Sequence, residues 1–167
     1  LLLQRVDPDG DLLFDVQGTR VALGPERQYF PIVRVDAVTS DLVVTWRDGL
    51  FEDQHVRAQR LMVDGTRLWG DHGVLVASLG AESTSYFDAH WSGMTLSTSI
   101  SRPAAGTATV HVHRVDAGGV VDPGATAVSG ETSAMAVAIG GFDEQVTVSF
   151  FEQIEGFDGQ LVAQRVN

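Results

Sequence analysis

The sequence predicts an all-β protein that is built from a repeated unit of four antiparallel strands. An arginine-centred segment occurs four times, as LLLQRVDPDG, VRAQRLMVDG, VHVHRVDAGG and LVAQRVN. Its arginines are spaced by 55, 54 and 51 residues, at Arg5, Arg60, Arg114 and Arg165. The intervening runs are short and rich in β-branched and aromatic residues, and no stretch keeps the 3.6-residue apolar period of a helix.

The arginine segment marks the third strand of each unit. A glycine follows the arginine by five residues in the first three copies, at Gly10, Gly65 and Gly119. Because tight turns that need a positive φ favour glycine, we expect a hairpin turn at each of these positions. The arginine recurs in every copy, so we expect a structural role, with its stem packed between sheets and its guanidinium bonded to backbone or a carboxylate.

The other strands of each unit are placed relative to this segment. The second strand is predicted in DLVVTWRD, MTLSTSIS and QVTVSFFE, where the residues fourteen positions before the arginine are Trp46, Ile100 and Phe151. The first strand is predicted in QYFPIVRVD, SYFDAHWSG and SAMAVAIGG, with Phe30, Phe87 and Met135 at comparable positions. The fourth strand follows the glycine turn in TRVALG, GVLVASLG and ATAVSG.

These strands divide the chain into the closing strands of one unit (1–28), two complete units (29–83 and 84–132) and a partial unit (133–167). A period of about 50 residues with four strands favours β-propeller-type blades, which bury their faces against their neighbours. The alternatives are an open repeat array and a β-sandwich, although a sandwich gives no reason for the common register. About three blades are too few for a closed ring, so we expect a fragment of a longer chain or a ring completed by a second copy.

The middle unit carries a resemblance to a known family. Residues 30–78, FPIVRVDAVTSDLVVTWRDGLFEDQHVRAQRLMVDGTRLWGDHGVLVAS, resemble a bacterial β-propeller-like repeat family whose units read P-x-V, LVVxWxD and AQRxDxDG. The other units match loosely, with Asp88 and Ala136 in place of Pro31. The resemblance implies this architecture and no particular activity.

Composition excludes several functions. With 22 acidic and 11 basic residues, the net charge of −11 and the lack of a basic cluster argue against nucleic acid as a partner. No apolar run approaches the roughly 20 residues of a membrane-spanning helix. The absence of cysteine excludes disulfides and thiolate chemistry. An acidic, cysteine-free chain is typical of exported bacterial proteins, so we expect an extracellular or cell-surface location.

The sequence offers little evidence for a metal, a cofactor or catalysis. His111 and His113 have the i, i+2 spacing of a metal-binding pair, but no third ligand is near them. The acidic run at 7–15 departs from the spacing of a calcium loop, so a turn is expected there. Nucleophile, phosphate-loop and zinc motifs are missing. We therefore expect no metal site, no cofactor and no enzymatic activity.

Loops at one rim of the repeats are the predicted binding surface. The loops that leave the second strands (47–55, 101–109, 152–160) should lie beside those that enter the first strands (23–28, 78–83, 129–133). The aromatic and acidic candidates on them are Phe51, Glu52, Asp53, Glu155, Phe157 and Asp158. We expect a non-enzymatic module for protein–protein interaction or assembly with itself or flanking blades. The alternatives are a lectin-like carbohydrate-binding module and a glycan-active propeller that uses the same carboxylates.

Overall fold

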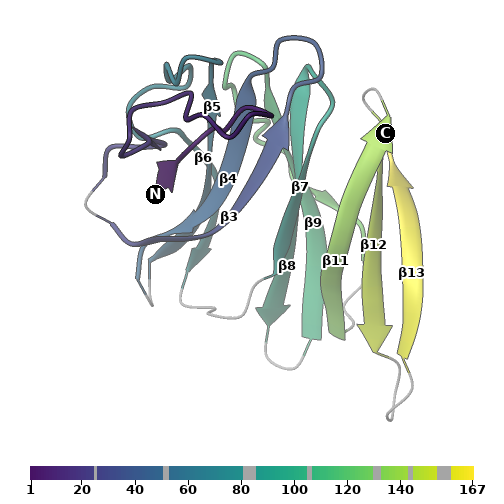
Figure 1. Ribbon diagram of the computed structural model, residues 1–167. Helices are drawn as coiled ribbons and strands as arrows, with labels where there is room; N and C mark the ends of the chain where they lie inside the picture. Colours follow the sequence, from purple (N-terminus) through teal and green to yellow (C-terminus); the bar gives the residue numbers. More distant parts are fainter. Residues whose placement is uncertain are drawn as a thin grey trace.

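The computed structural model shows an all-β chain (Figure 1). It describes residues 1–24, 26–50, 53–80, 86–104, 107–129, 133–142, 145–153 and 159–167. Within these ranges the chain forms thirteen strands and no helix. The predicted all-β class is therefore confirmed.

The middle of the chain forms two antiparallel sets of four strands, in which consecutive strands pair. The first set is a separate sheet, and the second is part of a seven-stranded sheet. The first sheet contains β3 (Gln28–Val35), β4 (Leu42–Asp48), β5 (Gln54–Leu61) and β6 (Val74–Gly80). The second contains β7 (Phe87–Trp91), β8 (Thr95–Ala104), β9 (Thr107–Asp116) and β10 (Thr126–Ala127). Each strand predicted in these two units is present, although β10 has only two residues.

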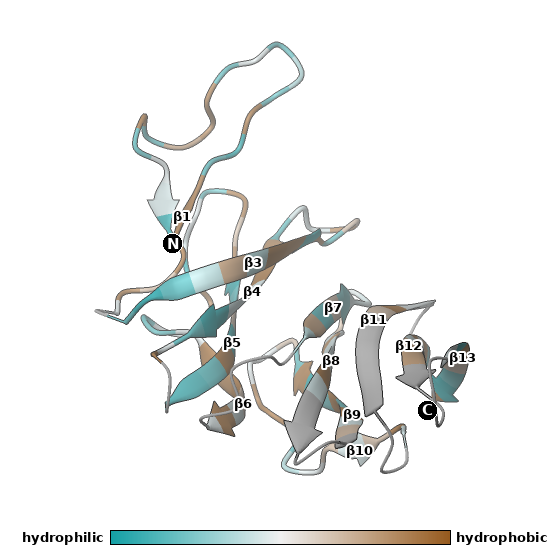
Figure 2. Cartoon of the chain, turned by 90° about the horizontal axis from the view of Figure 1, so that it is seen from below, coloured by the Kyte–Doolittle hydropathy of each residue, from teal (hydrophilic) through white to brown (hydrophobic). Residues whose placement is uncertain are grey.

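Shorter sets of strands flank these two sheets. The pair β1 (Leu2–Leu3) and β2 (Thr19–Arg20) precedes the first sheet. The antiparallel set β11 (Ser133–Phe142), β12 (Gln145–Gln153) and β13 (Gly159–Val166) follows the second sheet, to which a single parallel pair joins it. Seen from below, β3–β6, β7–β10 and β11–β13 form successive groups in chain order (Figure 2).

Three apolar layers hold these sets of strands together. Side chains alternate between the two faces of a strand, so Val44 and Trp46 of β4 face the β1–β2 pair while Val43 faces the second sheet. The layer between the β1–β2 pair and the first sheet contains Val21, Ala22, Val44, Trp46 and Leu61. The layer between the first and second sheets includes Val43, Val56, Ala58, Leu96 and Ile100. The layer between the second sheet and the last set includes Val110, Val112, Ile139, Val148 and Phe150.

The predicted glycine turns recur with the same geometry. The φ angles are +94°, +88° and +87° at Gly10, Gly65 and Gly119, a region that glycine adopts without steric cost. In each turn the glycine amide donates a hydrogen bond to the carbonyl three residues earlier, at 3.1, 2.9 and 3.0 Å. The first of these turns lies in the acidic segment at 7–15, where a turn was expected. There Asp7 Oδ1 accepts hydrogen bonds from the amides of Asp9 and Asp11. The predicted positive φ at the three glycines is confirmed.

The glutamine before the arginine fastens the hairpin in the first two copies, at Gln4 and Gln59, whereas the third copy has His113 at this position. Gln59 is fully buried, and its Nε2 donates to the carbonyl of Gly70 at 2.6 Å while its Oε1 accepts from the amides of Trp69 and Arg60 at 2.9 and 3.1 Å. Gln4 makes the three corresponding bonds in the first copy, at 2.8, 3.2 and 2.9 Å. The side-chain amide thereby satisfies backbone groups of the loop that follows the turn.

Arg60 has the structural role that the repetition predicts. Its guanidinium binds Asp41, with Nη2 and Nε at 2.7 and 3.0 Å from Oδ2. It also lies over the ring of Trp91 at 5.2 Å and donates to the carbonyl of Ala117 at 3.4 Å, both in the second unit. Arg165 is exposed, so the expectation of a packed stem is wrong for this copy.

Asp88 ties the first strands of three successive units together. Its Oδ1 accepts from Arg34 of β3 at 2.9 Å, and its Oδ2 accepts from the amide of Ile139 in β11 at 3.0 Å. Arg34 also donates to the carbonyl of Ala89 at 2.8 Å. These bonds place β3, β7 and β11 side by side. Of the aromatic positions predicted on these strands, Phe30 is 65% exposed, whereas Phe87 packs against the middle layer. The side chain of Met135 lies outside the described part of the structure.

One position of the sequence register needs correction. Counting back from the arginine aligned Phe151 with Trp46 and Ile100, but the paired strands align Phe150 with them. Phe150 is 2% exposed in the last apolar layer, whereas Phe151 is 38% exposed. The connection between β12 and β13 is one residue longer than a constant spacing assumes, and such a shift moves every side chain to the opposite face.

A buried carboxylate organises the turn between β3 and β4. Asp36 accepts hydrogen bonds from the amides of Val38 and Thr39 at 2.8 and 3.0 Å and from Trp91 Nε1 at 2.8 Å. Burial raises the pKa of Asp36, but these bonds and the charge of Arg60 outweigh that effect, so the pKa lies below its ordinary value of 3.8.

The apolar layers generate a prediction about stability. Trp46 and Phe150 are both buried, so Trp46→Ala and Phe150→Ala should each lower the free energy of unfolding by about 3–5 kcal/mol. Phe151→Ala is the matched control, and it should cost much less because its ring lies largely outside the layer. Urea unfolding followed by tryptophan fluorescence for Phe150 and Phe151, and by circular dichroism for Trp46, measures these differences. Equal costs at 150 and 151 would contradict the corrected register.

The contacts of Asp36 generate a prediction about pH. Asp36→Asn should lower the free energy of unfolding by about 1.5–3 kcal/mol at neutral pH, since hydrogen bonds to a charged group contribute about that much. The folded pKa lies below 3.8, so this stabilisation is complete above that pH and is lost as pH falls through the folded value. The difference between parent and variant in urea melts should therefore narrow below pH 3.8. Asp9→Asn at an exposed turn is the control, and a pH-independent difference for Asp36→Asn would contradict the assignment.

Candidate functional site

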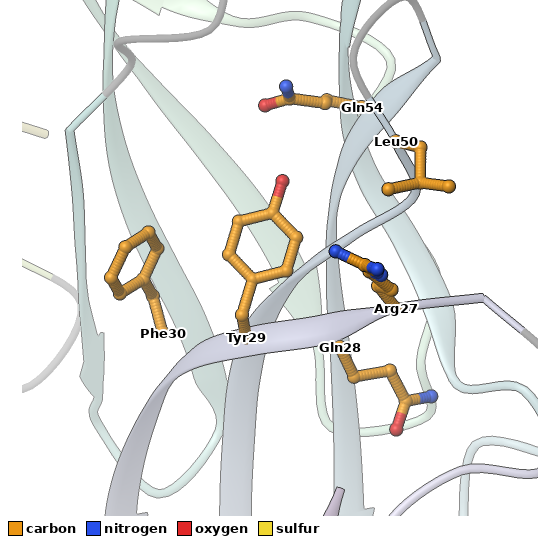
Figure 3. Close-up of a pocket in the computed structure, with 6 residues that line it drawn as sticks. All are labelled: Arg27, Gln28, Tyr29, Phe30, Leu50 and Gln54. Carbon is orange, nitrogen blue, oxygen red and sulfur yellow. The ribbon is translucent and has the colours of Figure 1, made fainter.

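A hollow lies where the segment before β3 meets the connection between β4 and β5 (Figure 3). These are two of the loops predicted to share a rim. The hollow has a volume of about 460 Å³ and is lined by Arg27, Gln28, Tyr29, Phe30, Leu50 and Gln54. The amide of Gly49 donates to the carbonyl of Arg27 at 3.1 Å, which holds the two segments together. We call this site the aromatic hollow.

A β-bulge gives the aromatic hollow its two rings. Consecutive side chains of a regular strand point to opposite faces. The pairing of β3 with β4 shifts by one residue between Tyr29 and Ile32, and Phe30 adopts a φ of +53°. As a result Tyr29 and Phe30 rise from the same side of β3, opposite to Gln28 (Figure 3). Their ring centroids lie 5.3 Å apart in an edge arrangement, with an interplanar angle of 71°.

The backbone at Phe30 is strained, and its side chain is exposed. A positive φ is uncommon for a residue other than glycine and costs free energy, about 1–2 kcal/mol. The ring is 65% exposed, so burial in the core does not explain why an aromatic residue occupies this position. Strained residues of this kind cluster at binding and active sites, and bulges commonly re-aim side chains there. The combination marks Phe30 as a functional candidate.

Polar side chains fix the position of Tyr29 and border the rings. The guanidinium of Arg47 lies over the Tyr29 ring, with 5.7 Å between Cζ and the ring centroid, and its Nη2 donates to Gln54 Oε1 at 2.9 Å. Gln54 and Leu50 lie across the hollow from the two rings (Figure 3). The hollow thus offers apolar ring surface beside planar hydrogen-bonding groups.

A second, charged hollow adjoins the first. It has a volume of about 370 Å³, and its lining is Glu26, Arg27, Asp48, Gly49, Leu50, Asp53, His55 and Arg57. The buried Asp48 pairs with Arg57, with Oδ2 and Nε 2.7 Å apart, and accepts from the amide of Gly49 at 3.1 Å. His55 Nε2 lies 3.0 Å from Asp53 Oδ1. A smaller hollow of about 260 Å³ extends from there toward His72.

Of the six predicted binding residues, the structure describes one. Asp53 lies in the charged hollow with its side chain 88% exposed. Phe51, Glu52, Glu155, Phe157 and Asp158 lie outside the described residues. Sequence reasoning missed Arg27, Tyr29, Phe30 and Gln54, because it placed Phe30 on an ordinary first strand. The only signal was the pair of adjacent aromatic residues in QYFPI.

The histidine pair on β9, His111 and His113, contacts neighbouring side chains or is buried. His111 Nε2 lies 3.0 Å from Thr109 Oγ1, and His113 is 8% exposed at the position that Gln59 has in the first sheet. Within the described ranges, no three His, Cys, Asp or Glu side chains are grouped closely enough to hold a metal ion. The described part of the chain also contains no helix long and apolar enough to span a membrane.

Comparisons with known proteins give one distant structural likeness. No protein-family model matches the chain, and no curated protein is similar to it. The chain aligns distantly with the structure of the endo-arabinase from Bacteroides thetaiotaomicron, with 14% identity and a TM-score of 0.45. The match covers 96% of this chain and 63% of that one, so the chain spans less than two thirds of the enzyme's length. A likeness of this size assigns neither an activity nor a substrate.

Proposed function

We propose that the chain is a non-enzymatic recognition module of β-propeller-type blades whose aromatic hollow binds a carbohydrate. The blade interpretation is supported by the repeated four-strand meander, by the apolar layers between successive sheets and by Asp88, which joins the first strands of three units. The acidic, cysteine-free composition supports a location outside the cell.

The observation that carries the proposal is the pair of rings presented by the bulge. A sugar ring has a face of C–H groups that packs on an aromatic ring and a rim of hydroxyls that need hydrogen-bond partners. Phe30 offers an exposed ring, and the exposed Arg27 offers a planar donor group at the border of the same hollow. A volume of about 460 Å³ falls within the range of roughly 300–1,000 Å³ typical of small-ligand sites.

The arrangement of carboxylates supports binding rather than hydrolysis. Hydrolysis of a glycosidic bond uses two carboxyl groups that flank the bond in a confined cleft. Among the described residues, those that line the aromatic hollow include no carboxylate. In the adjoining hollow Asp48 is paired with Arg57, and Asp53 is open to solvent beside His55.

The proposal predicts that substitutions of Phe30 affect carbohydrate binding and folding stability differently. Phe30→Ala should weaken binding of the oligosaccharides that score on a glycan array by about tenfold or more, which corresponds to about 1.4 kcal/mol. Phe30→Gly should weaken binding by the same factor, yet it should be at least as stable as Phe30→Ala because glycine adopts a positive φ freely. Calorimetric titration and urea melts give the two readouts. Val38→Ala at an exposed turn is the control.

Two results would contradict the proposal. One is an array on which the parent protein binds no glycan. The other is unchanged affinity in Phe30→Ala, with a folded far-ultraviolet spectrum, which would place any binding elsewhere.

Assembly by strand addition is a second candidate function. It is favoured by the edge strand β13 of the β11–β13 set. The third strands β5 and β9 each pair with a fourth strand, whereas β13 pairs with β12 alone within the described chain. Its side chains are largely exposed, including Leu161 at 71%. An exposed edge with few charges is a template for another strand. The occupant that we propose is a strand from a second copy.

The assembly proposal predicts a dimer that an edge charge disrupts. Light scattering should give twice the chain mass of 17.9 kDa, and Leu161→Lys should return the protein to a monomer because lysine on an edge opposes strand pairing. Val38→Lys adds the same charge at an exposed turn and should leave the dimer intact. A monomeric parent whose β13 amides are nevertheless protected from hydrogen exchange would refute this route.

A further inference from the structure

Arg27 differs from the arginines around it because its guanidinium has no partner among the described residues. Arg57 pairs with Asp48, Arg34 with Asp88 and Arg60 with Asp41, at 2.7 to 2.9 Å. Arg47 donates to Gln54 and covers one face of Tyr29. The side chain of Arg27 is exposed, and among the described residues its guanidinium has no hydrogen-bond or ion-pair partner.

Its backbone is nevertheless held in place. The carbonyl of Arg27 accepts the amide of Gly49, and the next residue begins β3, which pairs with β4 through Gln28 and Asp48. The free guanidinium therefore starts from a fixed point beside Tyr29 and Phe30. Figure 3 shows it on the same side of β3 as the two rings. It is also the only charged side chain that lines the aromatic hollow within the described chain.

We infer that the aromatic hollow selects a sugar that carries a carboxylate, a uronic acid residue, and that Arg27 binds this carboxylate. The inference rests on the proposed carbohydrate function. A guanidinium presents parallel N–H donors that match the two oxygens of a carboxylate, and such a charge-assisted pair is stronger than a hydrogen bond between neutral groups. A uronate carries its carboxylate at the rim of the sugar ring, so the ring can pack on Phe30 while the carboxylate reaches Arg27.

The net charge of −11 does not oppose this selection. At physiological ionic strength, charges on exposed groups are screened beyond about 8 Å, so the ligand's carboxylate responds mainly to its immediate neighbours. Among the described residues, the carboxylates of Glu26, Asp48 and Asp53 line the adjoining charged hollow and not the aromatic one, and Asp48 is paired with Arg57. A single uronate in an otherwise neutral oligosaccharide is therefore the expected ligand.

The test compares oligosaccharides that differ only in the carboxylate. The probes are oligosaccharides with a single glucuronate, galacturonate, mannuronate or guluronate, each beside its carboxyl-reduced counterpart, and calorimetry gives the affinities. At least one uronate should bind about tenfold or more tightly than its reduced form, because a hydrogen bond to a charged group contributes about 1.5–3 kcal/mol. The advantage should shrink as salt is raised.

Variants of Arg27 then assign the effect to this side chain. Arg27→Gln should bring the uronate down to the affinity of the reduced sugar and leave the reduced sugar unchanged. Arg27→Lys, which keeps the charge but loses the paired donors, should fall between. The exposed Arg20→Gln outside the hollow is the matched control and should change neither.

The outcomes separate this inference from the function on which it rests. If neither member of any pair binds, the proposed carbohydrate function fails. If both members bind with equal affinity, or if Arg27→Gln weakens both equally, the carbohydrate function stands and the uronate inference is overturned. Preferential binding of sulfated oligosaccharides over every uronate would also overturn it.

Discussion

Packing of one sheet face against the next is the interaction on which this structure depends. A four-stranded sheet has two faces, and alternation along β4 makes both of them apolar, with Trp46 on one and Val43 on the other. Burying a large aliphatic or aromatic side chain contributes about 1.5–3 kcal/mol, so neither face can be left in water without a large loss. The first sheet is therefore covered on both sides, and the sequence repeats the same apolar positions because successive layers are made in the same way.

Hydrogen bonds and ion pairs between the sheets fix their spacing and angle. Apolar contact alone would allow several spacings and angles. Asp88 bonds to β3 and β11 from its own strand between them, and Arg60 reaches from the first sheet to Trp91 and Ala117 of the second. Hydrogen bonds are directional, so they fix one arrangement among those that bury similar area. The buried amide of Gln59 acts at shorter range, because it anchors a loop onto the strand that precedes it.

The aromatic hollow depends on this rigid support. The positive φ of Phe30 costs free energy, and it persists because β3 is held by β4 on both sides of the bulge and by Arg34 at its far end. The strain has a geometric result, which is that two consecutive rings face one hollow. Arg47 lies over the ring of Tyr29, and the exposed ring of Phe30 and the exposed side chain of Arg27 extend from the same fixed strand.

The sequence alone determined the all-β class, the strands of the two middle units, the positive φ of Gly10, Gly65 and Gly119, and the packed role of Arg60. These features follow from local chemistry or from the internal repeat, both of which are visible in a string of residues. The tertiary structure alone decided that Phe150, and not Phe151, enters the last layer, because the register depends on the length of a hairpin connection. It also decided that Tyr29 and Phe30 share one side of β3. That outcome depends on how β3 pairs with β4, and a bulge is a property of two strands together rather than of either sequence.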